Sequence, residues 1–457
     1  MPLDENQMRL HLPGLDVAEA PQGGKRRQAN GRANKLAHED RHFHDWYRFV
    51  LSFPPHLVRD YLDDFGIKAG DLVLDPFCGT GTTLIECKLR GVRAIGLEAN
   101  PFAHFASSVK ADWGIDRAAL VSASRDVADN ALRILRRQGI EDMPTFDGRL
   151  EDVCLRSLDP ETSRLLLKGS ISPLPLHKAL VLLQCIRRRP SDACYGHMLL
   201  AFASALVFGA SNLRFGPEVG VGRPRYDAPV IALWLSHVQK IVDDLLIPRQ
   251  RPFARTEVHL ADARQPAKAI EPESIDAVIT SPPYPNEKDY TRTTRLESVM
   301  LGFIKSKDDL RSLKKLLVRS NTRGVYRGDD DDKWVSTHPE IQRIAEAIEK
   351  RRKALGKTSG FERMYGRVTK LYFGGMARHF AELRGVLRPG ARLAYVVGDQ
   401  ASYLRVMIRT GKILADIAQA LGYDVVRTDL FRTRFSTTTK EHLREEVVVL
   451  QWNGRGR

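Results

Sequence analysis

A glycine-rich turn between an apolar strand and a helix constrains the fold of this chain more than any other feature. Residues 72–74 are the apolar run LVL, and residues 75–83 continue as DPFCGTGTT before a helical pattern begins at Leu84. Gly79 and Gly81 let the backbone bend tightly and approach a ligand closely. This order of strand, turn and helix indicates an open α/β sheet whose ligand lies beyond the end of the strand.

A second strand follows the turn and ends in a carboxylate. Residues 93–97 are largely apolar and Glu98 comes next, roughly twenty residues after the turn, where a carboxylate can hold ribose hydroxyls. A dinucleotide-binding dehydrogenase shares this arrangement, but the turn lacks the third glycine of that fingerprint. The turn also has no Gly-Lys-Ser/Thr ending, which argues against a phosphate-binding NTPase loop.

A second short string, TSPPY at residues 280–284, directly follows the apolar run 277–279. Its two prolines fix φ and remove two backbone N–H groups, so few amides compete for the nearby carbonyls. Ser281 adds a hydroxyl and Tyr284 adds a flat ring. Such a corner can accept hydrogen bonds from an exocyclic amine and stack on its ring, as a flipped base requires. An ordinary exit from a strand, with proline as a stop, is the alternative interpretation.

Together these two strings resemble the S-adenosylmethionine-dependent DNA amino-methyltransferases, which modify N4 of cytosine or N6 of adenine. Serine before Pro-Pro-Tyr is more typical of the cytosine-N4 members, and Asp or Asn of the adenine-N6 members. The resemblance covers about residues 46–111, 256–304 and 371–452. It implies catalytic roles for Ser281, Pro282, Pro283 and Tyr284. It implies cofactor-binding roles for Asp75, Phe77, Gly79, Gly81, Thr82, Thr83, Glu98 and Asp262, the last near the adenine amine.

The alternation of strands and helices predicts an α/β fold with a parallel sheet. We expect a doubly wound, mostly parallel, seven-stranded methyltransferase (Rossmann-like) sheet with two largely helical insertions. The resemblance implies a closing antiparallel hairpin, with strands near 423–428 and 446–451. We further expect a turn at 387–390, a buried helix at 198–210, and helices at 293–303 and 375–386.

The predicted division of the chain has six parts. These are a flexible basic N-terminal arm (1–45), a first core segment that binds the cofactor (46–112), a helical insertion that is a candidate for DNA recognition (113–255), a second core segment with the corner (256–304), a second basic insertion (305–370) and a third core segment (371–457). Which insertion reads DNA stays open.

The charge of the chain suits a polyanionic partner. It has 71 Lys and Arg against 56 Asp and Glu, a formal net charge of +15. The candidate DNA-binding residues are Arg214, Arg223, Arg225, Arg292 and Arg295. Solvated arginines on a helical cap, or salt-bridged residues at a helix start, are the alternative interpretations. The polar residues after the corner are further candidates for a place near the base: Asn286, Glu287, Lys288, Asp289 and Tyr290.

The five cysteines form no Cys-x-x-Cys pair, so the sequence predicts neither a zinc ribbon nor a disulfide framework. We expect a cytoplasmic protein without a metal cofactor. The most apolar stretch, 198–210, is too short to span a bilayer, so no membrane partner is expected.

These features favour a site-specific DNA methyltransferase that modifies N4 of a flipped cytosine, in restriction–modification or phage defence. The cofactor would be S-adenosylmethionine, with S-adenosylhomocysteine as product. Double-stranded DNA would be the partner, and a cognate restriction endonuclease is a further candidate. The alternatives are an adenine-N6 DNA methyltransferase, an RNA base-amine methyltransferase and a catalytically inactive DNA-binding protein.

Overall fold

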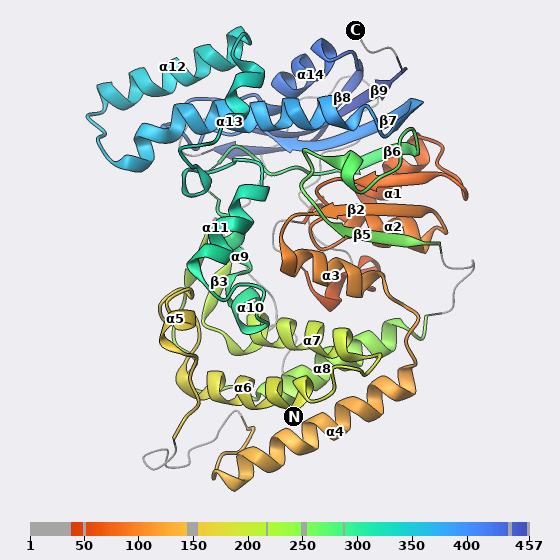
Figure 1. The fold of residues 1–457 in the computed structure, drawn as a ribbon, viewed down its shortest axis with the longest axis vertical. Helices are drawn as coiled ribbons and strands as arrows, with labels where there is room; N and C mark the ends of the chain where they lie inside the picture. The colour runs from red at the N-terminus through yellow and green to blue at the C-terminus, as the bar shows by residue number, and fades with distance from the viewer. Residues whose placement is uncertain are drawn as a thin grey trace.

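A seven-stranded sheet forms the centre of the computed structural model, which describes residues 38–48, 52–143, 154–215, 218–247, 254–286, 288–436 and 441–454. The strand order is β5-β2-β1-β6-β7-β9-β8 (Figure 1). The strands are β1 (Leu72–Asp75), β2 (Arg93–Glu98), β5 (Thr256–Leu260), β6 (Ile275–Thr280), β7 (Leu387–Gly398), β8 (Asp424–Ser436) and β9 (Glu441–Trp452).

The sheet is mostly parallel, as predicted. Strands β5, β2, β1, β6 and β7 pair in parallel, whereas β9 runs antiparallel to both β7 and β8. The α/β fold class and the closing hairpin are therefore confirmed. The predicted turn at 387–390 is wrong, because these residues already belong to β7 and Leu387 pairs with Ile275 before a shift in register. The strands of the hairpin are also longer than expected.

Alternate residues of the strands bury opposite faces of the sheet. Leu74, Val278 and Leu393 pack in one core with α13 (Gly360–Leu383) and α14 (Thr410–Ala420). Their neighbours Val73 and Ala277 pack in another core with α1 (Pro55–Asp64) and α2 (Thr82–Leu89). A strand whose two faces are both apolar must be covered on both sides. The sheet is thus doubly wound, with helices on each face.

The first insertion forms a helical layer below the sheet in the view of Figure 1. Its helices are α4 (Arg117–Arg137), α5 (Pro160–Ser163), α6 (Pro173–Arg187), α7 (Tyr195–Ser204) and α8 (Val230–Asp244). The predicted buried helix at 198–210 is α7 continued by a π-helical turn, Ala205–Ala210. A short hairpin, β3 (Leu213–Phe215) with β4 (Val219–Val221), separates that turn from α8. Helix α3 (Pro101–Ala111) packs between the sheet and this layer.

The second insertion contains α11 (Lys307–Leu316), the short 3-10 helices η6 (Thr322–Gly324) and η7 (Asp331–Val335), and α12 (Pro339–Ala354). Helix α13 then runs without a break from 360 to 383, so the predicted boundary at 370 falls inside one helix. The predicted helix at 293–303 is instead two short helices, α9 (Tyr290–Thr293) and α10 (Arg295–Met300), with Thr294 between them.

The end of the predicted N-terminal arm is ordered. Asp244 of α8 accepts hydrogen bonds from the Phe43 N–H at 2.6 Å and from Trp46 Nε1 at 2.8 Å. Phe43 and Trp46 are each 1% exposed. Residues 38–45 therefore do not belong to a flexible arm, and residues 1–37 lie outside the described part of the chain. None of the described helices is both long and apolar enough to cross a membrane.

Candidate active site

The glycine turn (residues 75–83) and the Ser-Pro-Pro-Tyr corner (residues 281–284) lie side by side. Strands β1 and β6 are parallel neighbours, so their carboxyl ends reach the same edge of the sheet. The Thr280 hydroxyl donates to Asp75 Oδ1 at 2.6 Å, and the Thr83 hydroxyl donates to the carbonyl of Ile279 at 3.1 Å. These two bonds join the turn to the strand that carries the corner.

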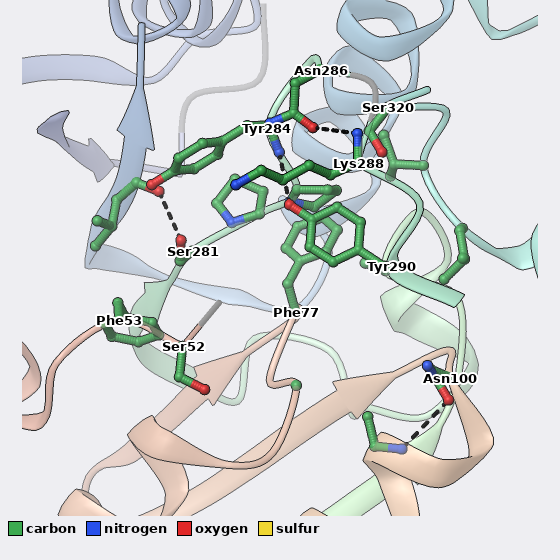
Figure 2. Close-up of a pocket in the computed structure, with 18 of the residues that line it drawn as sticks. Ser52, Phe53, Phe77, Asn100, Ser281, Tyr284, Asn286, Lys288, Tyr290 and Ser320 are labelled. Atoms are coloured by element: carbon green, nitrogen blue, oxygen red, sulfur yellow. Dashed lines mark hydrogen bonds between the residues drawn. The ribbon is translucent and has the colours of Figure 1, made fainter. Parts of the chain in front are cut away.

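One open cavity of about 1070 Å³ lies above this junction (Figure 2). All four corner residues line it. The predicted cofactor residues that line it are Phe77, Gly79, Thr82, Glu98 and Asp262. Asp75, Gly81 and Thr83 lie outside its lining, where they support the turn. A cavity of this size exceeds what a drug-sized ligand requires, so it has room for a nucleoside cofactor and a base together.

The two glycines of the turn serve different purposes. Both have left-handed backbones, with φ of 52° at Gly79 and 85° at Gly81. A Cβ at Gly79 would have no other atom within 4 Å, so this glycine leaves open space on the cavity wall. A Cβ at Gly81 would lie 3.1 Å from the Cβ of Ser107 in α3. Gly81 is therefore needed for the packing of α3 against the turn, and it acts on the cavity indirectly.

Glu98 holds the turn in place from the end of β2. Its two carboxylate oxygens accept the N–H of Gly79 at 2.8 Å and the N–H of Asn100 at 2.7 Å. Burial raises the pKa of Glu98 to about 7. Burial also raises the pKa of Asp75 to about 6, against the lowering effect of the Thr280 hydroxyl. Each Glu98 oxygen keeps a lone pair that can accept a ribose hydroxyl.

Asp262 lines the cavity beyond the end of β5, and Arg264 fixes its orientation. Arg264 Nη2 lies 2.7 Å from Asp262 Oδ2, while Nη1 lies 2.5 Å from Asp331 Oδ2 in the second insertion. Arg264 also donates to the carbonyl of Lys315 at 3.0 Å. The second insertion thereby packs against this end of the cavity, which residues 316–321 help to line. Two carboxylates beside an open glycine backbone can accept hydrogen bonds from the hydroxyls and the amine of an adenosine.

The corner presents acceptors and a flat ring. Ser281 Oγ donates to the Val396 carbonyl at 3.1 Å, so its lone pairs remain to accept hydrogen bonds. No backbone N–H of a described residue donates to the Pro282 carbonyl. The ring of Tyr284 packs on β7, where a Cβ at Gly398 would come within 3.0 Å of it. Burial raises the pKa of Tyr284, so the phenol stays neutral.

The five arginines predicted to bind DNA do not line the cavity. Arg295 donates to the Thr291 hydroxyl at 2.9 Å and to the Leu165 carbonyl at 3.2 Å. These bonds give Arg295 a structural role at the start of a helix, which was the alternative interpretation of the sequence. Arg214 and Arg223 are exposed on and beside the β3–β4 hairpin, and Arg225 follows it. Glu218 of the same hairpin lines the cavity, so this part of the first insertion reaches its rim. DNA contacts by these arginines stay a prediction.

Four of the five candidate residues after the corner line the same cavity as the corner itself. Asn286, Lys288, Asp289 and Tyr290 line the cavity, and Glu287 lies outside the described residues. Burial raises the pKa of Tyr290 to about 12, and its hydroxyl lies 3.4 Å from the N–H of Tyr284.

The sequence missed other parts of the cavity wall. They come from residues 316–321 of the second insertion and from the β8–β9 hairpin at Phe431, Arg432, Arg434 and Phe435. No local motif marks these segments, because only the folded chain brings them to the cavity. Asn100 was also missed, although its place at the N-cap of α3 after Glu98 was a usable signal.

Comparisons with known proteins agree with this geometry. A family model described as DNA methylase matches residues 23–107. The type II methyltransferase M.BsoBI of Geobacillus stearothermophilus is 24% identical over 465 residues, which cover 95% of this chain and 88% of that protein. M.AvaI of Nostoc sp. is 24% identical over 396 residues, which cover 83% of this chain and 79% of that protein. A tRNA (guanine(10)-N2)-dimethyltransferase of Methanothermobacter thermautotrophicus is 53% identical over 47 residues, only 10% of this chain and 14% of that protein.

These matches confirm the resemblance to the S-adenosylmethionine-dependent DNA amino-methyltransferases. They do not separate the cytosine-N4 members from the adenine-N6 members.

Proposed function

We propose that this chain methylates the N4 amine of a cytosine that is flipped out of a specific site in double-stranded DNA. One observation carries the proposal: the glycine turn and the Ser-Pro-Pro-Tyr corner open onto the same cavity. A methyl donor held by the first and a base held by the second would meet there. The full-length relatives that are type II methyltransferases support the same substrate class.

Glu98, Asp262 and the backbone at Gly79 would hold S-adenosylmethionine, which supplies an electrophilic methyl group on its sulfonium. The Ser281 hydroxyl and the Pro282 carbonyl would accept the two N–H bonds of the amine. These contacts favour a pyramidal nitrogen whose lone pair points out of the plane of the ring, where it could attack the methyl carbon; the amine would then lose a proton. Good orientation of two reacting groups can remove about 7–11 kcal/mol of barrier. Positioning by the corner is therefore the main source of the rate in this proposal.

Tyr284 would hold the extruded base by stacking. Base–aromatic stacking contributes about 1–3 kcal/mol, which helps to offset the few kcal/mol that flipping costs. The neutral phenol and the fixed position of the ring on β7 suit this role. The serine at 281, typical of the cytosine-N4 members, favours cytosine over adenine. A restriction–modification role, a cognate endonuclease and a cytoplasmic location remain predictions.

A base amine of RNA is the second candidate substrate. The local match to tRNA (guanine(10)-N2)-dimethyltransferases favours it, because guanine N2 is also an exocyclic amine. That match spans only a tenth of the chain, whereas the match to M.BsoBI spans nearly all of it.

One experiment tests these assignments. The purified chain is incubated with methyl-labelled S-adenosylmethionine and either duplex DNA or total RNA, and the nucleosides are identified by mass spectrometry. We expect N4-methylcytosine in DNA. N6-methyladenine in DNA, or label in RNA alone, would replace the proposed substrate with one of the alternatives.

A further inference from the structure

Lys288 lies four residues after Tyr284, and two amide side chains hold its backbone at the cavity wall. Its N–H donates to Asn286 Oδ1 at 2.9 Å, and its carbonyl accepts from Asn321 Nδ2 at 3.1 Å. Asn286 and Asn321 are both buried. The starting point of the Lys288 side chain is therefore fixed from two sides, one of them the second insertion.

The Lys288 side chain crosses the cavity toward the corner. Figure 2 shows it extending back toward Tyr284, on the side of the cavity where Ser281 lies. Within the described ranges, its Nζ makes no hydrogen bond and no ion pair. Glu445 on the β8–β9 hairpin, a carboxylate that acts on the pKa of Lys288, is engaged by Arg432 at 2.5 Å.

Among the described residues, none of the charged groups around Lys288 forms an ion pair with its ammonium group. Burial is the main cause of its lowered pKa, and Arg434 lowers it further, whereas Glu445 and Glu218 act in the opposite direction. A partly buried ammonium group with three donors gains most from an acceptor that is brought to it. The Lys288 ammonium group is thus available as a hydrogen-bond donor on the side of the cavity that faces the corner.

We propose that Lys288 donates a hydrogen bond to the ring carbonyl O2 of the flipped base and so selects cytosine over adenine. On cytosine, the N4 amine and O2 lie on the same edge of the ring, on either side of N3. Ser281 and Pro282 would accept from the amine while Lys288 donates at the other end of that edge. Adenine carries a C–H in place of O2, so its entry would leave the ammonium group unpaired. This inference rests on the proposed function, because it assumes a base amine at the corner.

The direct test replaces Lys288 with methionine, which keeps the length of the side chain and removes the charge. Lys288→Arg keeps a cationic donor, and Lys350→Met on the exposed side of α12 is the matched control. Unmodified genomic duplex DNA is methylated by each variant, and N4-methylcytosine and N6-methyladenine are counted by mass spectrometry. The affinity for S-adenosylmethionine and the melting temperature are measured on the same samples.

We expect Lys288→Met to lower kcat/KM for cytosine about 10- to 100-fold, the loss of one charge-assisted hydrogen bond. The affinity for S-adenosylmethionine and the melting temperature should stay near those of Lys350→Met. Lys288→Arg should recover part of the rate, and the ratio of modified adenine to modified cytosine should rise in Lys288→Met.

Three outcomes would overturn the role of Lys288. Undiminished cytosine methylation by Lys288→Met would show that O2 is not read by this residue. Loss of S-adenosylmethionine binding by Lys288→Met would indicate that Lys288 contacts the cofactor and not the base. N6-methyladenine as the product of the unmutated chain would remove both this role and the cytosine assignment, whereas the first two results leave the proposed function intact.

Discussion

The floor and the walls of the cavity are built in different ways. The floor consists of the glycine turn and the Ser-Pro-Pro-Tyr corner, which follow neighbouring parallel strands and are joined by the Thr280–Asp75 hydrogen bond at 2.6 Å. The walls consist of the β3–β4 hairpin, residues 316–321 of the second insertion and the β8–β9 hairpin. These wall segments come from separate parts of the sequence, and each contributes side chains to the cavity.

This difference indicates which function the floor and the walls of the cavity can each serve. The floor is set by the sheet, so it can hold a methyl donor and an amine in fixed geometry whatever the rest of the substrate is. The walls can vary without moving the floor, which suits the recognition of one base and one DNA site. We therefore expect floor variants to remove cofactor binding or chemistry, and wall variants to change substrate preference or affinity.

Gly81→Val should have the largest effect and would test the floor as a unit. The new side chain must adopt a φ of 85° and meets Ser107 at 3.1 Å. Backbone strain and overpacking of this kind each cost about 1–3 kcal/mol. Calorimetry should find S-adenosylmethionine binding weakened about 100-fold or more.

Gly139→Val is the matched control for that variant. Gly139 has a similar φ of 72°, but a Cβ there would have no neighbour within 4 Å and the residue lies outside the cavity lining. The Gly139→Val variant should have the backbone strain without the overpacking, and should keep its affinity for S-adenosylmethionine. Normal cofactor binding by Gly81→Val would contradict the link between α3 packing and the cofactor site.

Tyr284→Ala should separate the two halves of the floor. Removing the ring should lower kcat/KM on duplex DNA about 10- to 100-fold, because a stacking contact of about 1–3 kcal/mol is lost. The affinity for S-adenosylmethionine should stay within a few fold, since the glycine turn is untouched. Tyr284→Phe keeps the flat ring and should remain close to the unmutated enzyme in steady-state assays. Equal activity of Tyr284→Ala and Tyr284→Phe would disprove the stacking role.

The floor could be predicted from the sequence because both of its parts are local. A strand followed by glycines, and a strand followed by Ser-Pro-Pro-Tyr, each show their position at a strand end through neighbouring residues. Their meeting then follows from the rule that parallel strands share a carboxyl edge. Even so, the sequence could not tell that Gly81 packs on Ser107 instead of lining the cavity, because Ser107 lies 26 positions away in another helix.

The walls could not be predicted for the opposite reason. Asn321 meets Lys288 across 33 positions of the chain, and Arg264 meets Asp331 across 67. Such pairings depend on how α11 and the loop after it pack on the sheet, and no periodic pattern encodes them. The prediction for the candidate arginines rests on charge and on position in the sequence. Neither distinguishes Arg295, held by protein carbonyls, from Arg434 on the cavity wall.

Glu98→Gln should have a moderate effect that depends on pH. The pKa of Glu98 is raised to about 7, so in the unmutated protein the ionised acceptor forms as the pH rises through that value. Affinity for S-adenosylmethionine should therefore increase between about pH 6 and pH 8. The glutamine variant cannot ionise and should bind about 10-fold more weakly at pH 8, one hydrogen bond to a charged group being worth about 1.5–3 kcal/mol. Titration calorimetry at several pH values measures both slopes, and parallel slopes would exclude Glu98 as the titrating group.

Arg434→Gln should have the smallest effect, and it tests the walls. Arg434 is exposed on β8, lines the cavity and is close enough to Lys288 to lower its pKa. If it contacts a phosphate beside the flipped base, its loss should weaken DNA binding only about 3- to 10-fold and reduce the slope of log Kd against log salt by about 0.9. Arg343→Gln, on the exposed side of α12 and outside the cavity lining, is the control. Fluorescence anisotropy over a series of salt concentrations measures the slope. An unchanged slope together with a lower kcat would indicate that Arg434 acts in methyl transfer and not in DNA binding. The division of roles between floor and walls would then be wrong for the β8–β9 hairpin.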